Sequence, residues 1–173
     1  MLAVALAGLV AFIVAGMLWH RPMARLAGAG PGMVAFDVHT HTNVSHDVRG
    51  TLMRGFDAQA ARRWHARAGF DAFFITDHNT VEGLTHVPGR PVACPGIEVS
   101  AWRAHIVLLG DTLPVDRSRY GGSPGGLRAL LRESDSAYGA LSVLSLPEYE
   151  RYHRDDLDSL LAAGADGLEI VNA

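Results

Sequence analysis

Two hydrophobic patterns alternate along the chain. Short apolar runs that end at polar residues predict strands over 33–38, 70–76, 92–99, 106–109, 140–144 and 166–171. Between them, apolar residues recur at helical spacing, as in Phe56, Ala60, Trp64 and Ala68, and predict helices over 56–68, 123–133 and 155–163. Strands that alternate with helices are typical of βαβ units, so the sequence predicts an α/β fold with a mostly parallel sheet that is open or barrel-like.

The start of the chain forms a separate unit. Residues 2–19 carry no charge, and at about 1.5 Å per residue they span about 27 Å, close to a hydrocarbon core of roughly 30 Å. We therefore expect a transmembrane anchor over residues 1–20, a Gly/Ala-rich linker over 21–32 and a domain over 33–173. Arg21 and Arg25 follow the run, which predicts a single-pass membrane protein with a cytoplasmic domain. The alternative, a cleaved signal peptide, lacks a basic segment before the run.

Charge and cysteine content exclude several classes of protein. After residue 33 the chain has 13 basic and 18 acidic residues, a net charge of −5, which excludes nucleic-acid backbone binding as the main function. The single cysteine, Cys94, excludes an internal disulfide and a multi-cysteine metal site. The nine histidines are numerous for 173 residues, and their positions carry most of the functional information.

Side chains that bind metals lie at the ends of four predicted strands. The segment Asp37-Val-His-Thr-His41 closes the first strand, and Ser45-His-Asp47 follows it. Because alternate residues of an extended segment share a face, Asp37, His39 and His41 are expected to point the same way. Thr76-Asp-His78 follows the second strand, Glu98 ends the third and His105 opens the fourth. Each motif alone has an ordinary explanation, such as an exposed histidine pair, a turn cap at Asp77 or a core histidine.

The coincidence of these motifs favours a metal centre. Parallel strands bring like ends to one edge of a sheet, where α/β proteins place their sites. Imidazoles and carboxylates without thiolates are ligands for Zn²⁺, Mn²⁺ or Fe²⁺. A carboxylate between imidazoles can bridge two ions, and such a cluster stabilises the attacking and leaving oxygens of phosphoester displacement.

The ordered set of motifs resembles the polymerase-and-histidinol-phosphatase (PHP) domain of metal-dependent phosphoesterases. The segments Ser45-His-Asp and Thr76-Asp-His-Asn-Thr-Val-Glu-Gly83 are most similar to its CehA/McbA-like branch. The resemblance covers about residues 34–173. It implies a distorted (β/α)7 barrel, here partial, with two or three divalent metal ions at the carboxyl ends of the strands and a small phosphoester as substrate.

The resemblance also implies a role for each motif. The paired histidines would hold the first metal, and Glu98 would bridge it to a second metal that His105 also holds. Asp47 and His78 would belong to a third metal, with the adjacent His46 as a lesser candidate in place of Asp47. Glu98 and His105 are the expected catalytic residues. The expected metal ligands are His39, His41, Asp47, His78, Glu98 and His105.

The chain departs from the family pattern in two places. Leu146 stands where the family has a ligand histidine after the fifth strand, and Glu148 or His153 could compensate. The chain ends before the closing Asp-x-His of the family, so we expect a domain that is incomplete at its C-terminus. Glu169 and Asn172 match a recurrent strand-end pattern of the family and are interpreted as supporting polar groups rather than ligands.

Three functions remain open at this point. The leading hypothesis is a membrane-tethered, metal-dependent phosphoesterase. The alternatives are a degenerate, non-catalytic PHP module in a membrane complex and a metallohydrolase of amide or carbamate bonds. The sequence predicts no oligomeric state.

Overall fold

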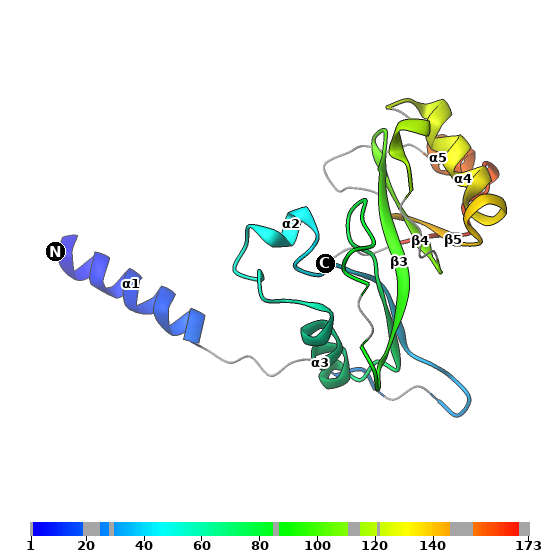
Figure 1. Cartoon of the computed structure of the whole chain (residues 1–173). Coiled ribbons are helices and arrows are strands. Elements are labelled where there is room, and N and C mark those ends of the chain that lie inside the picture. The colour runs from blue at the N-terminus through cyan, green and yellow to red at the C-terminus, as the bar shows by residue number, and fades with distance from the viewer. Residues whose placement is uncertain are drawn as a thin grey trace.

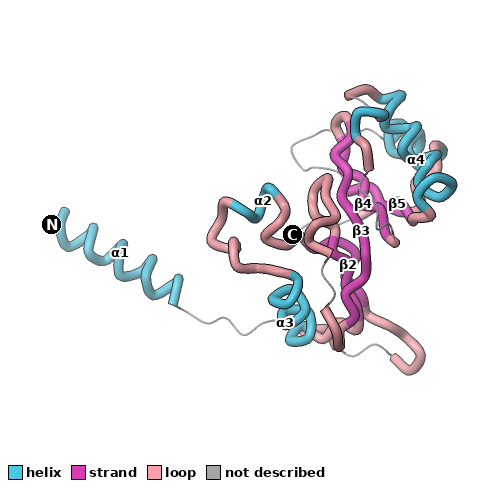
Figure 2. The backbone as a smooth tube through the Cα atoms, in the orientation of Figure 1, coloured by secondary structure: helices cyan, strands magenta, loops and turns pink. Residues whose placement is uncertain are grey.

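The structure is a computed structural model that describes residues 2–18, 25–27, 30–84, 87–110, 115–120, 122–145 and 154–169. Figures 1 and 2 show how its helices and strands are arranged. Along the chain these are α1 (Leu2–Leu18), β1 (Phe36–Thr40), α2 (His46–Arg49), α3 (Ala58–Ala68), β2 (Ala72–Ile75), β3 (Val92–Ala101), β4 (Ala104–Leu109), the 3₁₀ helix η1 (Arg117–Arg119), α4 (Pro124–Tyr138), β5 (Leu141–Ser145), α5 (Arg154–Ala162) and β6 (Gly167–Leu168).

Each predicted strand and helix of the domain overlaps an observed one, and the predicted helix boundaries have identifiable caps. The Asp57 carboxylate accepts a hydrogen bond from the backbone of Ala60 at the start of α3, and Gly69 ends this helix in the left-handed conformation. The Ser123 hydroxyl accepts from the backbone N–H of Gly126 at the start of α4. The local predictions of secondary structure are therefore confirmed.

The six strands form one curled sheet, in the order β1 to β6, that describes about half a barrel. β1, β2 and β3 run parallel, β4 is antiparallel to both β3 and β5, and β5 and β6 run parallel. The expected partial (β/α)7 barrel with a mostly parallel sheet is therefore wrong. The reason is local, because only Trp102 and Arg103 separate β3 from β4. Such a short turn joins antiparallel strands, whereas parallel strands need a crossover of about a dozen residues or more.

The main hydrophobic core lies between the central strands and α4, which packs beside β5 in Figure 1. Alternate residues of β3 and β4, including Ile97, Val99, Ile106 and Leu108, are fully buried in it. The intervening residues Glu98, Ser100 and His105 therefore project from the opposite face. A slip of one residue would bury the polar set in the apolar core, so hydrophobic burial specifies which side chains reach the site.

A second, smaller core lies beneath α3. Ala58 and Ala61 of the helix pack against Phe73 and Ile75 of β2, and all four are buried. These contacts hold β2 beside β1, with which it pairs in parallel. The ends of both strands are thereby brought next to the end of β3.

The expected membrane anchor is wrong. α1 has 17 residues, which at about 1.5 Å per residue reach about 26 Å, short of the roughly 30 Å hydrocarbon core. Among the described residues, none of the helices has both the length and the hydropathy that crossing a bilayer requires. The predicted single-pass membrane localisation, and the cytoplasmic placement that depended on it, therefore lose their basis. Trp19 and Arg21, which contributed to that prediction, lie outside the described residues.

Candidate metal centre

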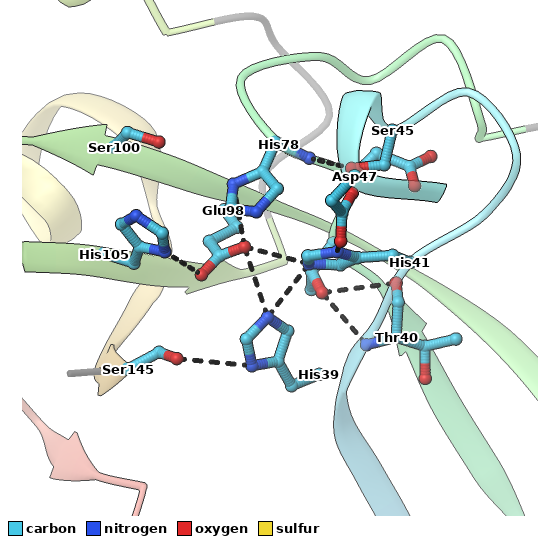
Figure 3. A network of polar contacts seen from close by, with 12 residues as sticks. His39, Thr40, His41, Ser45, Asp47, His78, Glu98, Ser100, His105 and Ser145 are labelled. Carbon is cyan, nitrogen blue, oxygen red and sulfur yellow. Dashed lines mark hydrogen bonds and ion pairs between the residues drawn. The ribbon is translucent and has the colours of Figure 1, made fainter. Parts of the chain in front are cut away.

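Glu98 of β3 lies at the centre of four imidazole rings (Figure 3). The carboxylate is 1% exposed, and its Oε1 lies 2.9 Å from Nδ1 of His105. Its Oε2 lies 2.9 Å from both Nε2 of His41 and Nδ1 of His78, and 3.3 Å from Nε2 of His39. The residues come from β1, β3, β4 and the segment after β2, so the curled sheet converges on this one carboxylate.

Oε1 of Glu98 makes a hydrogen bond with Nδ1 of His105, whereas the contacts of its Oε2 do not have the directions of ordinary hydrogen bonds. Its Oε2 and Nδ1 of His78 are buried and, among the described residues, neither makes a hydrogen bond, although 2.9 Å separates them. Nε2 of His39 and Nε2 of His41 also lie only 3.0 Å apart. Nitrogen ligands at about 2.0–2.1 Å from one tetrahedral ion lie roughly 3.3 Å from each other. The side chains therefore converge as ligands of a shared cation do, and the donor set fits a divalent metal.

The described residues form three groups that could each hold an ion. They are His39, His41 and Glu98; His41, Asp47 and His78; and His78, Glu98 and His105, with the ligand atoms of each group within 4.8 Å of one another. All six predicted ligands belong to these groups, and every two groups share one residue. The arrangement suits a cluster of two or three ions, while metal binding itself stays a prediction.

The segment after β2 is held in place by hydrogen bonds to both neighbouring strands. His78 forms an isolated parallel bridge with Glu98, and the backbone N–H of Asn79 donates to the Glu98 carbonyl at 2.8 Å. The buried Asp77 does not cap a turn. Its carboxylate accepts from the backbone N–H of Thr42 at 2.5 Å and from the Thr42 hydroxyl at 2.7 Å, which ties the ends of β1 and β2 together. The Ser45 hydroxyl accepts from the backbone N–H of His78.

Carboxylates on the outer side of the cluster orient two of the histidines. Nδ1 of His39 lies 3.0 Å from Oε2 of Glu169, and Nδ1 of His41 lies 2.7 Å from Oδ2 of Asp47. Metal-bound histidines commonly donate their second ring N–H to a carboxylate, which fixes the tautomer and the ring direction. Glu169 thus lies where a supporting group is expected, in agreement with its interpretation from the sequence, and Asp47 can act either as a support or as a ligand.

Burial and ion pairing act in opposite directions on the charges of the cluster. Burial alone raises the pKa of Glu98, but the hydrogen bond from His105 and the close imidazoles of His39, His41 and His78 outweigh it and hold the pKa far below the usual range. Burial alone lowers the pKa of His39, but the contacts with Glu169 and Glu98 raise it to about 10. The raised pKa values of His39 and His41 favour protonated imidazoles that balance the buried carboxylate in the absence of metal, and a divalent cation can replace those protons.

Asp37 does not join the cluster, contrary to the prediction that it shares a face with the two histidines. The register of β1 against β2 shifts between Asp37 and Thr40, which interrupts the alternation. The Asp37 carboxylate lies 3.0 Å from Nε2 of His65 instead and accepts from the backbone N–H of His39. His65 is buried, stacks on Phe73 and donates its Nδ1–H to the Ala61 carbonyl at 2.8 Å.

The supporting role of His65 could not be predicted from spacing, because α3 and β1 meet only in the folded chain.

His46 lies with its ring 4.6 Å from that of His78 but belongs to none of the three groups among the described residues. His105 opens β4, so the site combines the carboxyl ends of β1, β2 and β3 with the amino end of an antiparallel strand. Leu146, Glu148, His153 and Asn172 lie outside the described residues.

Neither comparison by sequence identifies a family. No protein-family model matches the chain, and no curated protein matches it. The resemblance to PHP domains therefore rests on the motifs alone and stays a prediction.

Proposed function

We propose that this protein is a metal-dependent hydrolase of phosphoesters, of the PHP type, with two or three Mn²⁺, Zn²⁺ or Fe²⁺ ions. The observation that supports this most strongly is the buried Glu98 carboxylate, whose two oxygens lie within 3.3 Å of nitrogens from four imidazoles. A buried carboxylate shared by two of the three potential ligand groups suits a bridge between ions. The similarity of the same residues to PHP motifs favours phosphoesters over amides and carbamates.

All six residues would hold ions, and one of them, His105, would also transfer a proton. His39, His41 and Glu98 would hold one ion, Glu98 with His105 a second, and Asp47 with His78 a third. The ions would polarise a phosphoryl oxygen and make hydroxide available near neutral pH. Glu98 remains ionised because four imidazoles stabilise its negative charge. It can therefore bridge cations and neutralise their charge without a proton competing for its oxygens.

His105 is the imidazole best placed to contact substrate. Its side chain is 26% exposed, against 9% for His39, 15% for His41 and 8% for His78. Nδ1 faces Glu98 at 2.9 Å, which leaves Nε2 as the nitrogen that can donate a hydrogen bond or a proton to the leaving oxygen. This assigns to His105 the proton transfer that accompanies cleavage of the phosphorus–oxygen bond.

The test begins with chain stripped of metal by a chelator and reloaded separately with Mn²⁺, Zn²⁺ or Fe²⁺. We expect hydrolysis of phosphoesters such as p-nitrophenyl phosphate only in the reloaded protein, and loss of at least a hundredfold in kcat for Glu98→Gln. Glu82→Gln makes the same chemical change at an exposed position and should retain full activity. If the chain binds metal by elemental analysis but cleaves no phosphoester, the proposal fails. Cleavage of amides or carbamates alone would support the other hydrolase class.

A further inference from the structure

A cavity of about 300 Å³ lies at the end of β3 that carries Glu98. It is lined by Ser100, Trp102, Arg117, Ser118 and Gly122. The volume is at the lower end of the range for small-molecule sites and suits a single substituted ring. None of its lining residues takes part in holding metal in the proposed function.

The cavity begins next to the candidate metal centre. Ser100 follows Glu98 by two positions, so both side chains project from one face of β3, about 7 Å apart along the strand. Ser100 is also the register partner of His105 in the antiparallel pair, and Figure 3 shows it beside that histidine. A phosphoryl group held at the metals would therefore place its leaving group at the mouth of the cavity.

Two hydrogen bonds to Asn79 fix the position of Ser100 in the lining of the cavity. Its hydroxyl accepts from the Asn79 amide nitrogen at 3.1 Å, and its backbone N–H donates to the Asn79 amide oxygen at 2.9 Å. Asn79 in turn donates its backbone N–H to Glu98. The same bonds that position the centre of the metal cluster thus position the start of the cavity.

Arg117 provides positive charge in the cavity. Its Nε donates to the Ser100 carbonyl at 3.1 Å, which holds the guanidinium against β3. Among the described residues, no carboxylate forms an ion pair with Arg117, whereas Arg119 of the same 3₁₀ helix pairs with Glu133 at 2.9 Å. A guanidinium in this position can bind a carboxylate or phosphate of a ligand through its remaining N–H groups.

Trp102 provides an aromatic surface. It occupies the short turn between β3 and β4, is 44% exposed and has a φ of 52°. The Arg103 guanidinium carbon lies 5.6 Å from the ring centroid, over one face of the indole, and Trp102 is part of the cavity lining. An exposed indole beside an arginine suits an aromatic ligand that carries a negative charge.

We infer that this cavity binds the leaving group of the substrate, and that this group is an aromatic ring bearing an anionic substituent. Trp102 stacks on the ring, and Arg117 binds the anion. This inference rests on the proposed function, because it assigns a substrate class to the same metal centre.

The test compares three phosphomonoesters with the metal-loaded full chain, namely 4-carboxyphenyl phosphate, phenyl phosphate and butyl phosphate. Each variant is compared with the unaltered chain on the same substrate, which removes differences in leaving-group reactivity. We expect Trp102→Gly to lower kcat/KM about threefold to tenfold for both aryl esters and not for the butyl ester. Glycine tolerates a positive φ, so this variant retains the turn. Arg117→Gln should lower kcat/KM at least tenfold for the carboxylated ester alone, with partial rescue by Arg117→Lys.

Matched controls separate the cavity from general effects. Trp64 is 41% exposed on α3, so Trp64→Gly removes an equally exposed indole elsewhere. Arg119→Gln removes the same charge from the same 3₁₀ helix, outside the cavity lining. Neither control should change the ratio of kcat/KM for aryl and butyl esters. Equal losses on all three substrates, or losses of the same size in the controls, would overturn the inference.

Direct binding separates this inference from the proposed function. The product 4-hydroxybenzoate needs no hydrolysis, and calorimetry with the full chain should detect its binding. Trp102→Gly and Arg117→Gln should weaken that binding, and Trp64→Gly and Arg119→Gln should not. If no phosphoester is cleaved but this pattern of binding is found, the proposed function fails and the ligand class of the cavity stands. Hydrolysis without binding of 4-hydroxybenzoate, or without aryl preference, would overturn the inference and leave the proposed function intact.

Discussion

Nδ1 of His39 on β1 lies 3.0 Å from Oε2 of Glu169, directly after β6. These residues are 130 positions apart, and they lie on the first strand of the sheet and directly after the last. Their contact joins β1 to the segment after β6 beside the candidate metal cluster. Glu169 therefore couples the position of the last strand to the direction of a predicted metal ligand.

Glu169→Gln should weaken metal binding by about tenfold to a hundredfold, because the imidazole of His39 loses the carboxylate that fixes its tautomer and orientation. The dissociation constant can be measured by competition between the chain and a chromogenic chelator for Zn²⁺. Glu82→Gln is the control and should bind with the affinity of the unaltered chain. Equal affinity of Glu169→Gln and the unaltered chain would show that Glu169 has no part in the centre.

Metal binding should release protons near neutral pH. In the metal-free chain, burial alone lowers the pKa of His39, but Glu169 and Glu98 raise it to about 10. A metal ion binds the unprotonated ring nitrogen, so at pH 7 this proton must leave. The apparent affinity should therefore rise by about tenfold per pH unit for each proton released, as long as the pH stays below about 10. Calorimetry in buffers of different ionisation enthalpy measures the number of protons directly. If the measured heats did not depend on the buffer, no protons would be released on metal binding. The prediction that His39 is protonated in the metal-free chain would then be wrong.

His65→Leu should lower the free energy of unfolding by about 2 kcal/mol, because the change removes the imidazole that pairs with Asp37 and leaves that carboxylate without its partner. Urea denaturation of the metal-free chain measures the loss. Arg63→Ala, on the exposed face of the same helix, should change stability by no more than about 0.5 kcal/mol. The metal affinity of His65→Leu should also fall, since Asp37 holds the backbone N–H of His39.

Gly83→Ala should be destabilising by about 1–3 kcal/mol, because a Cβ at this position would overlap Oδ2 of Asp77 and lie 2.7 Å from the Thr42 hydroxyl. The overlap forces apart the two side chains that tie β1 to β2. Thermal unfolding with and without the substitution tests this expectation. Gly55 has open space around its Cβ position, so Gly55→Ala should leave the unfolding temperature nearly unchanged. A stable Gly83→Ala variant would mean that the Asp77–Thr42 contact contributes little.

The residues of the candidate cluster could be identified from the sequence because their chemistry is local, while their role as metal ligands stays a prediction. His39 and His41 lie two positions apart on an extended segment, and Glu98 interrupts an apolar strand where an unpaired carboxylate would be costly to bury. The sequence predicts that these motifs lie at one edge of a parallel sheet. They do lie together, although β4 is antiparallel to both of its neighbours. His105 reaches the site because a two-residue turn folds β4 back along β3, which brings it opposite Ser100.

Other parts of the site depend on contacts between distant segments. The pairing of His65 with Asp37 requires α3 to pack on β2 and a shift in the register of β1. The cavity at Trp102 forms only where the turn after β3 meets η1. No spacing along the chain encodes these distances, because each depends on how separate elements pack.

The amino-acid order by itself determined the strands, the helices and the residue types that could hold a cation, because periodicity, caps and side-chain chemistry act over a few neighbouring positions. Only the tertiary structure decided the direction of β4 and the convergence of four imidazoles on Glu98. These follow from burial of two apolar cores, which selects one face of each strand and one curl of the sheet. The candidate metal ligands lie on the polar face of the strands, opposite the buried apolar residues.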